Sequence, residues 1–325
     1  MQEESFQSRV DLSALSEQVK KIKQEIGKII IGQERMIDLL ITAILADGHV
    51  LIEGVPGVAK TLTAKLLAKI IAIDFSRIQF TPDLMPSDVL GTSVYNLKTS
   101  EFEFKAGPIF SNLVLIDEIN RAPAKTQAAL FEVMEERQVT VDGHTHKMKN
   151  PYLVMATQNP IEQEGTYRLP EAQLDRFLFK IVVNYPGFDE EVEILTKHHG
   201  RLGALPVLEV NAILSADQIE LMRRFSNQVH VELNLVKYIA QIVQETRNNP
   251  MLFLGASPRA SIAILSSAKA YAVINGRDFV SPEDIKLVAL PVLRHRIVLS
   301  PEKEMEGVSA DEAVNMIINK VEVPR

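Results

Sequence analysis

Hydrophobic and polar positions divide the chain into a part that mixes helices with strands and a later part of helices alone. Apolar residues recur at helical spacing over 12–29 and over 36–44, which predicts two amphipathic helices. Short apolar runs bounded by polar or turn residues predict buried strands. These strands are expected at 50–52, 75–81, 113–116, 152–157 and 177–183.

The segments between these strands show helical or hairpin patterns, and the segments after them show signals for helix starts. Helical patterns cover 62–71 and 123–137, whereas 92–104 and 138–148 alternate like hairpins, the second around Asp142-Gly143. From Gly187 onward, helix starts are marked by capping residues or by a first-turn proline. These starts lie at Ser215, Ser257-Pro258, Ser281-Pro282 and Ser309. We therefore predict an α/β domain over 1–187 and a linker with an α-helical domain over 188–325.

The segment 49–61 joins a buried strand to a helix through a glycine-containing loop. Gly54 and Gly57 surround Pro56, and Lys60-Thr61 open the helix. Backbone N–H groups and a helix N-terminus favour a bound phosphate there. Lys60 would reach the β- and γ-phosphates, and the Thr61 hydroxyl would bind Mg²⁺. The usual pattern has glycine before the lysine, whereas this chain has Ala59, which we expect a helical backbone to tolerate.

Polar residues end two of the later strands. Asp117 and Glu118 follow the run 113–116, at the strand end where open α/β sheets bind ligands. Asp117 can join a Mg²⁺ shell, and Glu118 can accept a proton from an attacking water. Asn159 follows the next strand and can position water and sense a γ-phosphate. The alternative for the acidic pair is a solvated cap of the next helix.

Several arginines could stabilise the charge of a transferred phosphoryl group. They are Arg121, Arg168, Arg176 and Arg259. Each could equally form an ordinary surface ion pair, which contributes little.

Composition limits the partners that we expect. The formal net charge is −7, so a broad basic surface for nucleic acid is not expected. The chain has no cysteine, which excludes disulfides and thiolate-bound metal. It shows neither a signal pattern nor an apolar run of membrane-spanning length. The expectation is a soluble cytoplasmic protein.

The order of these motifs resembles that of AAA+ ATPases. More narrowly, five segments resemble the MoxR family, and the likeness runs over residues 12–325. The segments are GVPGVAKT (54–61), DEINRAP (117–123), ATQNP (156–160), LPEAQLDRF (169–177) and GASPR (255–259). The resemblance implies a P-loop core with a parallel sheet flanked by helices, two hairpin insertions and a helical lid.

The resemblance also implies site residues and partners. Glu118 and Asn159 would act with Arg176, the arginine finger for a neighbouring subunit, and with Arg259, known as sensor 2. ATP would be held by Gln33 near the adenine and by Gly54, Pro56, Gly57, Val58, Ala59, Lys60, Thr61 and Leu62. Thr61 and Asp117 would hold Mg²⁺. The family acts as chaperone-like ATPases that aid maturation or the insertion of cofactors and metals in protein clients, often as hexameric rings beside a protein with a von Willebrand factor A domain.

Two other functions are compatible with the same core. A nucleic-acid motor of the helicase or restriction-ATPase type shares the core and the hairpins, although the acidic balance disfavours it. A nucleotide-gated scaffold would bind ATP and barely turn it over, which intact Glu118 and Arg176 disfavour.

Overall fold

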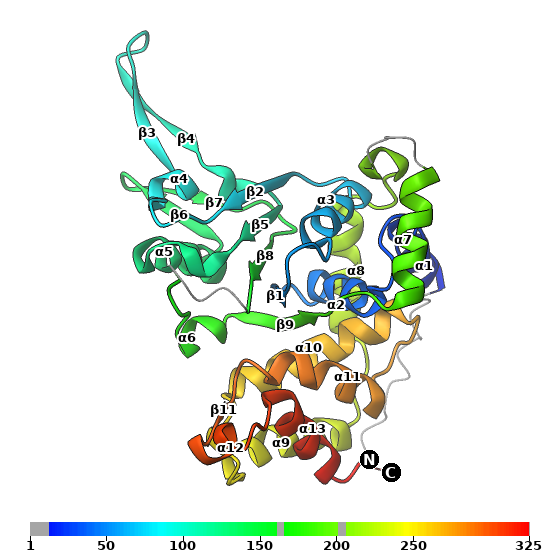
Figure 1. Cartoon of the computed structure of the whole chain (residues 1–325). Helices are drawn as coiled ribbons and strands as arrows, with labels where there is room; N and C mark the ends of the chain where they lie inside the picture. Colours follow the sequence, from blue (N-terminus) through cyan, green and yellow to red (C-terminus); the bar gives the residue numbers. More distant parts are fainter. Residues whose placement is uncertain (1–12, 161–165, 201–205, 325) are drawn as a thin grey trace, which may run out of the picture.

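A five-stranded parallel sheet lies at the centre of the first part of the chain (Figure 1). The computed structural model describes residues 13–160, 166–200 and 206–324. The strands lie side by side in the order β2-β5-β8-β1-β9, and every neighbouring pair is parallel. Their bounds are β1 His49–Gly54, β2 Phe75–Gln79, β5 Leu113–Asp117, β8 Leu153–Gln158 and β9 Phe177–Val183. All five strands were predicted from the sequence.

Helices cover both faces of this sheet because successive strand residues point to opposite sides. Val50 and Ile52 join one buried apolar cluster, whereas Leu51 between them joins another. The first cluster is covered by α1 (Ser13–Gly27), α2 (Glu34–Leu45) and α3 (Lys60–Ile70), and the second by α5 (Ala124–Glu136). Leu12, where the first helix was predicted to begin, lies outside the described residues.

Two hairpins project from the α5 side of the sheet (Figure 1). They are formed by β3 (Gly91–Asn96) with β4 (Glu101–Ala106), and by β6 (Gln138–Val141) with β7 (His144–Lys147). Asp142 and Gly143 both have positive φ, as a two-residue hairpin turn requires. The rings of Phe104 and His146 stack at 4.2 Å, so the two hairpins touch each other. Short helical turns precede and follow the first hairpin, at α4 (Pro86–Leu90) and η1 (Pro108–Phe110).

The remaining elements are mainly helical. They are η2 Ile119–Arg121, α6 Glu171–Leu174, α7 Phe188–Gly200, η3 Pro206–Glu209, α8 Ala216–Gln228, α9 Leu233–Asn248, α10 Pro258–Ile274, α11 Pro282–Leu293, α12 Pro301–Met305 and α13 Ala310–Lys320, with a small antiparallel pair of β10 Leu252–Leu254 and β11 Val298–Leu299. The side chains of Ser215, Ser281 and Ser309 cap α8, α11 and α13 as predicted. The pair β10–β11 was not predicted, because strands this short carry no readable alternation. Among the described residues, no helix combines the length and apolar composition needed to cross a bilayer.

The helical part packs directly on the α/β part. Helix α10 contacts α2, and α11 contacts β9, so one buried apolar cluster continues through both parts. Arg296, after α11, is 9% exposed and fixes the start of β9. Its guanidinium donates to the Asp175 carboxylate at 2.7 Å and to the Phe177 carbonyl at 2.6 Å. The helical part therefore holds the strand that begins directly after Arg176.

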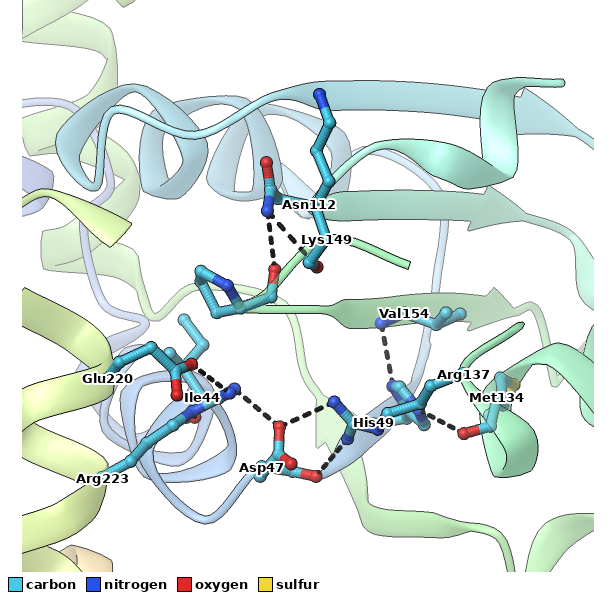
Figure 2. A network of polar contacts seen from close by, with 11 residues as sticks. Ile44, Asp47, His49, Asn112, Met134, Arg137, Lys149, Val154, Glu220 and Arg223 are labelled. Carbon is cyan, nitrogen blue, oxygen red and sulfur yellow. Dashed lines mark hydrogen bonds and ion pairs between the residues drawn. The ribbon is translucent and has the colours of Figure 1, made fainter. Parts of the chain in front are cut away.

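A polar network makes a second joint between the two parts (Figure 2). Asp47, in the turn between α2 and β1, forms ion pairs with two arginines that come from different elements. Arg137, directly after α5, lies 2.9 Å from the Asp47 carboxylate, and Arg223 of α8 lies 2.8 Å from it. Arg223 also donates to the Ile44 carbonyl at 2.8 Å. The end of α5 is thus tied through Asp47 to a helix of the second part.

Candidate nucleotide site

An open pocket of about 370 Å³ lies where β1, β5 and β8 end. It is lined by Pro56, Gly57, Ala59, Lys60, Thr61, Leu62, Arg77, Gln79, Asp117, Glu118, Thr157 and Asn159. The structure therefore brings together three segments that were predicted separately: the phosphate loop, the acidic pair and Asn159. It also adds Arg77, Gln79 and Thr157, to which no sequence motif assigns a role.

The loop that follows β1 has the geometry of a cradle. Gly57 has φ +88°, and a Cβ at this position would meet no other protein atom within 4 Å. Lys60 opens α3, and its Nζ donates to the Gly54 carbonyl at 2.6 Å. Helix N-termini leave N–H groups without intrahelical acceptors, and these favour an anion. Gly54 packs closely against β9, where a Cβ would lie 2.7 Å from the Val183 carbonyl oxygen. Val58 is buried, so it anchors the loop to the core.

Ala59 adopts an unusual backbone conformation at the start of α3. We expected alanine to tolerate a helical backbone here, but its φ of 58° and ψ of 20° are left-handed. This region disfavours residues with a Cβ and is the one that glycine adopts without strain. The loop keeps the geometry of the common glycine pattern and holds Ala59 in a strained conformation.

The two acidic residues are fixed by neighbours from other strands. Asp117 is 8% exposed, and its carboxylate accepts from Arg77 Nε at 2.6 Å and from the Thr157 hydroxyl at 3.1 Å. The Thr157 hydroxyl also accepts the Glu118 N–H at 3.1 Å. Gln79 Nε2 donates to Glu118 Oε2 at 2.8 Å. One threonine thus orients both acidic residues, and β2 supplies a further partner for each.

Glu118 adopts an unusual backbone conformation directly after β5. Glu118 has φ 57° and ψ 54°, which is left-handed and strained for a residue with a side chain. Its Oε2 also lies 3.0 Å from Arg121 Nε. Strained residues of this kind cluster at functional sites, which makes Glu118 a candidate for a chemical role.

The residues that were missed carry only a weak signal in the sequence. Arg77 and Gln79 alternate with the buried Ile78 in β2, which is a pattern of many strands with one polar face. Their importance depends on β2 lying beside β5, with Gln79 in register with Asp117. No pattern within the β2 segment indicates that it lies beside β5.

The side chains in the pocket fit a Mg²⁺–nucleotide. Mg²⁺ prefers oxygen ligands and usually binds through one or two carboxylates together with phosphate oxygens. Asp117 and the Thr61 hydroxyl offer such oxygens beside the cradle, and Lys60 offers a positive charge. Side chains suited to a triphosphate and a metal ion are therefore gathered where β1, β5 and β8 end.

Arg176 and Arg259 lie together at a different place. Arg176 directly precedes β9, whereas the phosphate loop follows Gly54, which pairs with Val183 at the other end of β9. A seven-residue strand separates the two by about 20 Å. Arg259, in the first turn of α10, shares one acceptor with Arg176, the carboxylate of Glu135. Neither arginine lines the nucleotide pocket, and Arg259 is placed beside Arg176 and not beside its own phosphate loop.

Gln33 lies at the same edge of the sheet as the phosphate loop. It precedes α2, and its Nε2 donates to the carbonyl of Asn184, which follows β9, at 3.3 Å. It is not among the residues that line the pocket. Asn159 does line it, at the end of β8.

Comparisons with known proteins give a consistent result. Residues 49–179 match the ATPase family associated with various cellular activities (AAA), and residues 244–317 match the AAA lid domain. The YeaC protein of Bacillus subtilis is 48% identical, with 94% of each chain covered. Chaperone MoxR1 of Mycobacterium tuberculosis is 44% identical over 93% of this chain and 81% of its own. A crystal structure of a candidate ATPase from Cytophaga hutchinsonii superimposes with a TM-score of 0.90 at 44% identity, covering 97% of both chains.

Proposed function

Because the chain belongs to the MoxR family of AAA+ ATPases, we propose that it hydrolyses Mg²⁺–ATP and uses the energy to remodel protein clients. The observation that carries the proposal is the assembly of Lys60, Asp117 and Glu118 around one pocket. We take residues 1–187 as the nucleotide-binding domain and 188–325 as the linker and lid. Both family matches fall inside these bounds.

Each pocket residue has a task in this reaction. The cradle and Lys60 bind the phosphates, Thr61 and Asp117 hold the metal ion, and Glu118 accepts the proton of the attacking water. Mg²⁺ would neutralise charge on the β- and γ-phosphates. Asn159 orients the water or the γ-phosphate. Thr157 keeps Asp117 and Glu118 in a fixed relative orientation through its hydroxyl.

Arg176, the arginine that the resemblance implies as the finger, lies one strand length away from the phosphate loop of its own chain. We propose that Arg176, with Arg259 beside it, completes the pocket of a neighbouring subunit in a closed homo-oligomeric ring. The resemblance implies that this ring is a hexamer. Heterologous contacts of this kind form a ring when the rotation between successive subunits closes. An arginine supplied in trans is worth about 10³–10⁵ in rate in well-studied GTPases.

Mixing two inactive variants tests this arrangement. Lys60→Ala should lose ATP binding but offer an intact Arg176, and Arg176→Ala should bind ATP but lack the finger. Mixed rings contain some interfaces with a good pocket and a good finger, so ATPase activity should partly return. A matched control is Arg168→Ala, since Arg168 is 90% exposed and pairs only distantly with Glu171. A mixture that co-assembles, as shown by labelled subunits, and stays inactive would exclude the shared site.

The clients are proposed to be proteins in need of maturation or of an inserted cofactor or metal, with a von Willebrand factor A domain protein as partner. The chaperone name of the Mycobacterium tuberculosis relative supports a protein client. The test compares ATPase rates with an unfolded protein, with a co-purified von Willebrand factor A partner and with DNA or RNA at low and moderate salt. Stimulation by nucleic acid alone would favour a nucleic-acid motor instead.

A further inference from the structure

We propose that Glu135 is a positioning residue that holds Arg176 and Arg259 together as a pair for the neighbouring subunit's site; this inference rests on the shared site proposed above. Glu135 Oε2 lies 2.8 Å from Arg176 Nη2, and its Oε1 lies 3.0 Å from Arg259 Nη2. One carboxylate therefore binds one arginine with each oxygen. The two arginines come from different parts of the chain, the end of the α/β part and the first turn of α10.

The charges around this carboxylate explain why it is needed. The ion pairs of Arg176, Arg259 and Arg296 are made with two carboxylates, those of Glu135 and Asp175. Glu132 and Glu136 line the groove beside Arg176 but, among the described residues, form no such pair with it. Asp175 is already engaged by buried Arg296 at 2.7 Å, while Arg259 lies 3.9 Å from it. Without Glu135, Arg176 would lose the carboxylate that it pairs with, and Arg259 would keep only the more distant Asp175 carboxylate. Like charges repel, so the pair would separate.

Glu135 itself sits on a rigid support. It lies in the last turn of α5, two residues before Arg137, whose ion pair with Asp47 fixes the end of that helix (Figure 2). One turn earlier, the ring of Phe131 lies 5.9 Å below the Arg176 guanidinium. Phe131 is fully buried, so both contacts of Arg176 come from a fixed helix. A site built on a rigid element holds its groups more accurately than one on loops.

The arginine pair remains open to an approaching group. The side chains of Arg176 and Arg259 are 31% and 60% exposed, and they face a cavity of about 220 Å³ beside Glu135. A partly exposed ion pair contributes little to stability, so loss of Glu135 should leave the fold intact. The carboxylate is therefore better explained as an orienting group than as a structural one.

The contact also joins the lid to the finger. Arg259 belongs to the lid and Arg176 to the α/β part, and Glu135 is the acceptor that they share. The lid position of one subunit would then affect how well that subunit serves its neighbour's ATP. Glu135 has no such link to its own pocket, whose lining residues do not include it.

The variant Glu135→Ala tests this role in the full-length chain. We expect kcat for ATP to fall by about 10-fold to 100-fold, as a misplacement of about 1 Å can cost, with KM and nucleotide affinity within twofold of the parent. Glu135→Gln keeps the shape and one acceptor oxygen, so its loss should be smaller. The matched control is Glu136→Ala, which removes a neighbouring exposed acid from the groove that Glu135 and Arg176 also line. It should keep the parental rate.

Complementation then separates positioning of the finger from a general effect. A Glu135→Ala subunit has a good pocket and a poor finger, so mixing it with Lys60→Ala should restore activity, and mixing it with Arg176→Ala should not. A parental ATPase rate for Glu135→Ala would overturn the inference. A raised rate would overturn it as well, because it would mean that Glu135 holds the arginines away from the neighbouring site. Restored ATPase activity in the mixture of Glu135→Ala with Arg176→Ala would also overturn the inference. If mixed rings of Lys60→Ala and Arg176→Ala co-assemble but show no ATPase activity, the proposal of a shared site is itself wrong. The proposed role of Glu135 would then be wrong with it.

Discussion

Arg77 Nε lies 2.6 Å from Asp117 Oδ2, so the strand at the edge of the sheet supplies a positive charge to the carboxylate proposed to hold Mg²⁺. Asp117 is 8% exposed, whereas the Arg77 side chain is 49% exposed. The arginine can therefore swing away into solvent when the carboxylate takes another cation. Arg77 and a metal ion would compete for the same oxygen.

This competition predicts an effect of Arg77→Gln. Removing the competing cation should lower the Mg²⁺ concentration that gives half-maximal ATPase by roughly twofold to fivefold, the range of a partly exposed ion pair. Titrating MgCl₂ at fixed ATP measures the shift. The matched control is Lys149→Gln, which removes a positive charge from an exposed pair with Asp74. A shift of equal size in both variants would mean that only net charge matters.

Glu118→Gln separates binding from hydrolysis. The amide can still meet Gln79 through its oxygen, but it cannot take a proton from water. ATP affinity should stay within about twofold of the parent, and kcat should fall by about 10²–10⁴-fold, the usual contribution of a general base. Calorimetry and a phosphate-release assay measure the two quantities. Turnover at the parental rate would show that another group accepts the proton.

Ala59→Gly should stabilise the nucleotide-free protein. Ala59 has φ 58°, where a Cβ costs about 1–2 kcal/mol, while glycine adds a smaller entropic cost in the unfolded chain. The net gain in the free energy of unfolding should be about 0.5–1 kcal/mol by urea denaturation. The same change in an ordinary helix is the control: Ala128→Gly, at an exposed position in α5, should lose about 1 kcal/mol. Losses in both proteins would mean that the left-handed conformation carries no strain.

Acid should weaken the fold through His49. Its Nδ1 accepts the Val154 N–H at 3.0 Å, and its other nitrogen, Nε2, lies 3.1 Å from the Met134 carbonyl (Figure 2). Burial, with a further contribution from Arg137, lowers the pKa of His49 to about 3. An unfolded histidine has a pKa near 6.5, so between these values only the unfolded state binds the proton. Stability from this group is complete above pH 6.5 and is lost as the pH falls toward 3.

The magnitude can be tested with His49→Gln, whose amide offers one donor and one acceptor. Between pH 7.5 and pH 5, the parent should lose about 2 kcal/mol through His49, at about 1.4 kcal/mol per pH unit below 6.5. Urea denaturation at the two pH values should give a correspondingly smaller loss in the variant. Buried His295, whose pKa burial also lowers, contributes equally to both proteins and cancels in the comparison. An identical loss in parent and variant would contradict the assignment.

Much of the fold could be predicted because its signals are local. The uninterrupted apolar run of β5 indicates a strand with both faces covered, and all of its residues are buried. The hairpin at Asp142-Gly143 follows from turn residues that accept positive φ. The caps at Ser215 and Ser281 depend only on a hydroxyl and the N–H three residues later. The small pair β10–β11 escaped prediction because its partners are far apart in sequence and each strand is too short to show a period.

By itself, the sequence determined the phosphate loop, the acidic pair after β5 and the strand–helix order, because each depends on residues that are neighbours along the chain. Only the tertiary structure decided that Gln79 meets Glu118, since this needs β2 beside β5 in one register. It alone placed Arg259 with Arg176, because the docking of the lid on α2 and β9 sums many long-range contacts that no single segment encodes. It also decided the left-handed backbone of Ala59, because the packed strand and helix on either side of the loop constrain its conformation.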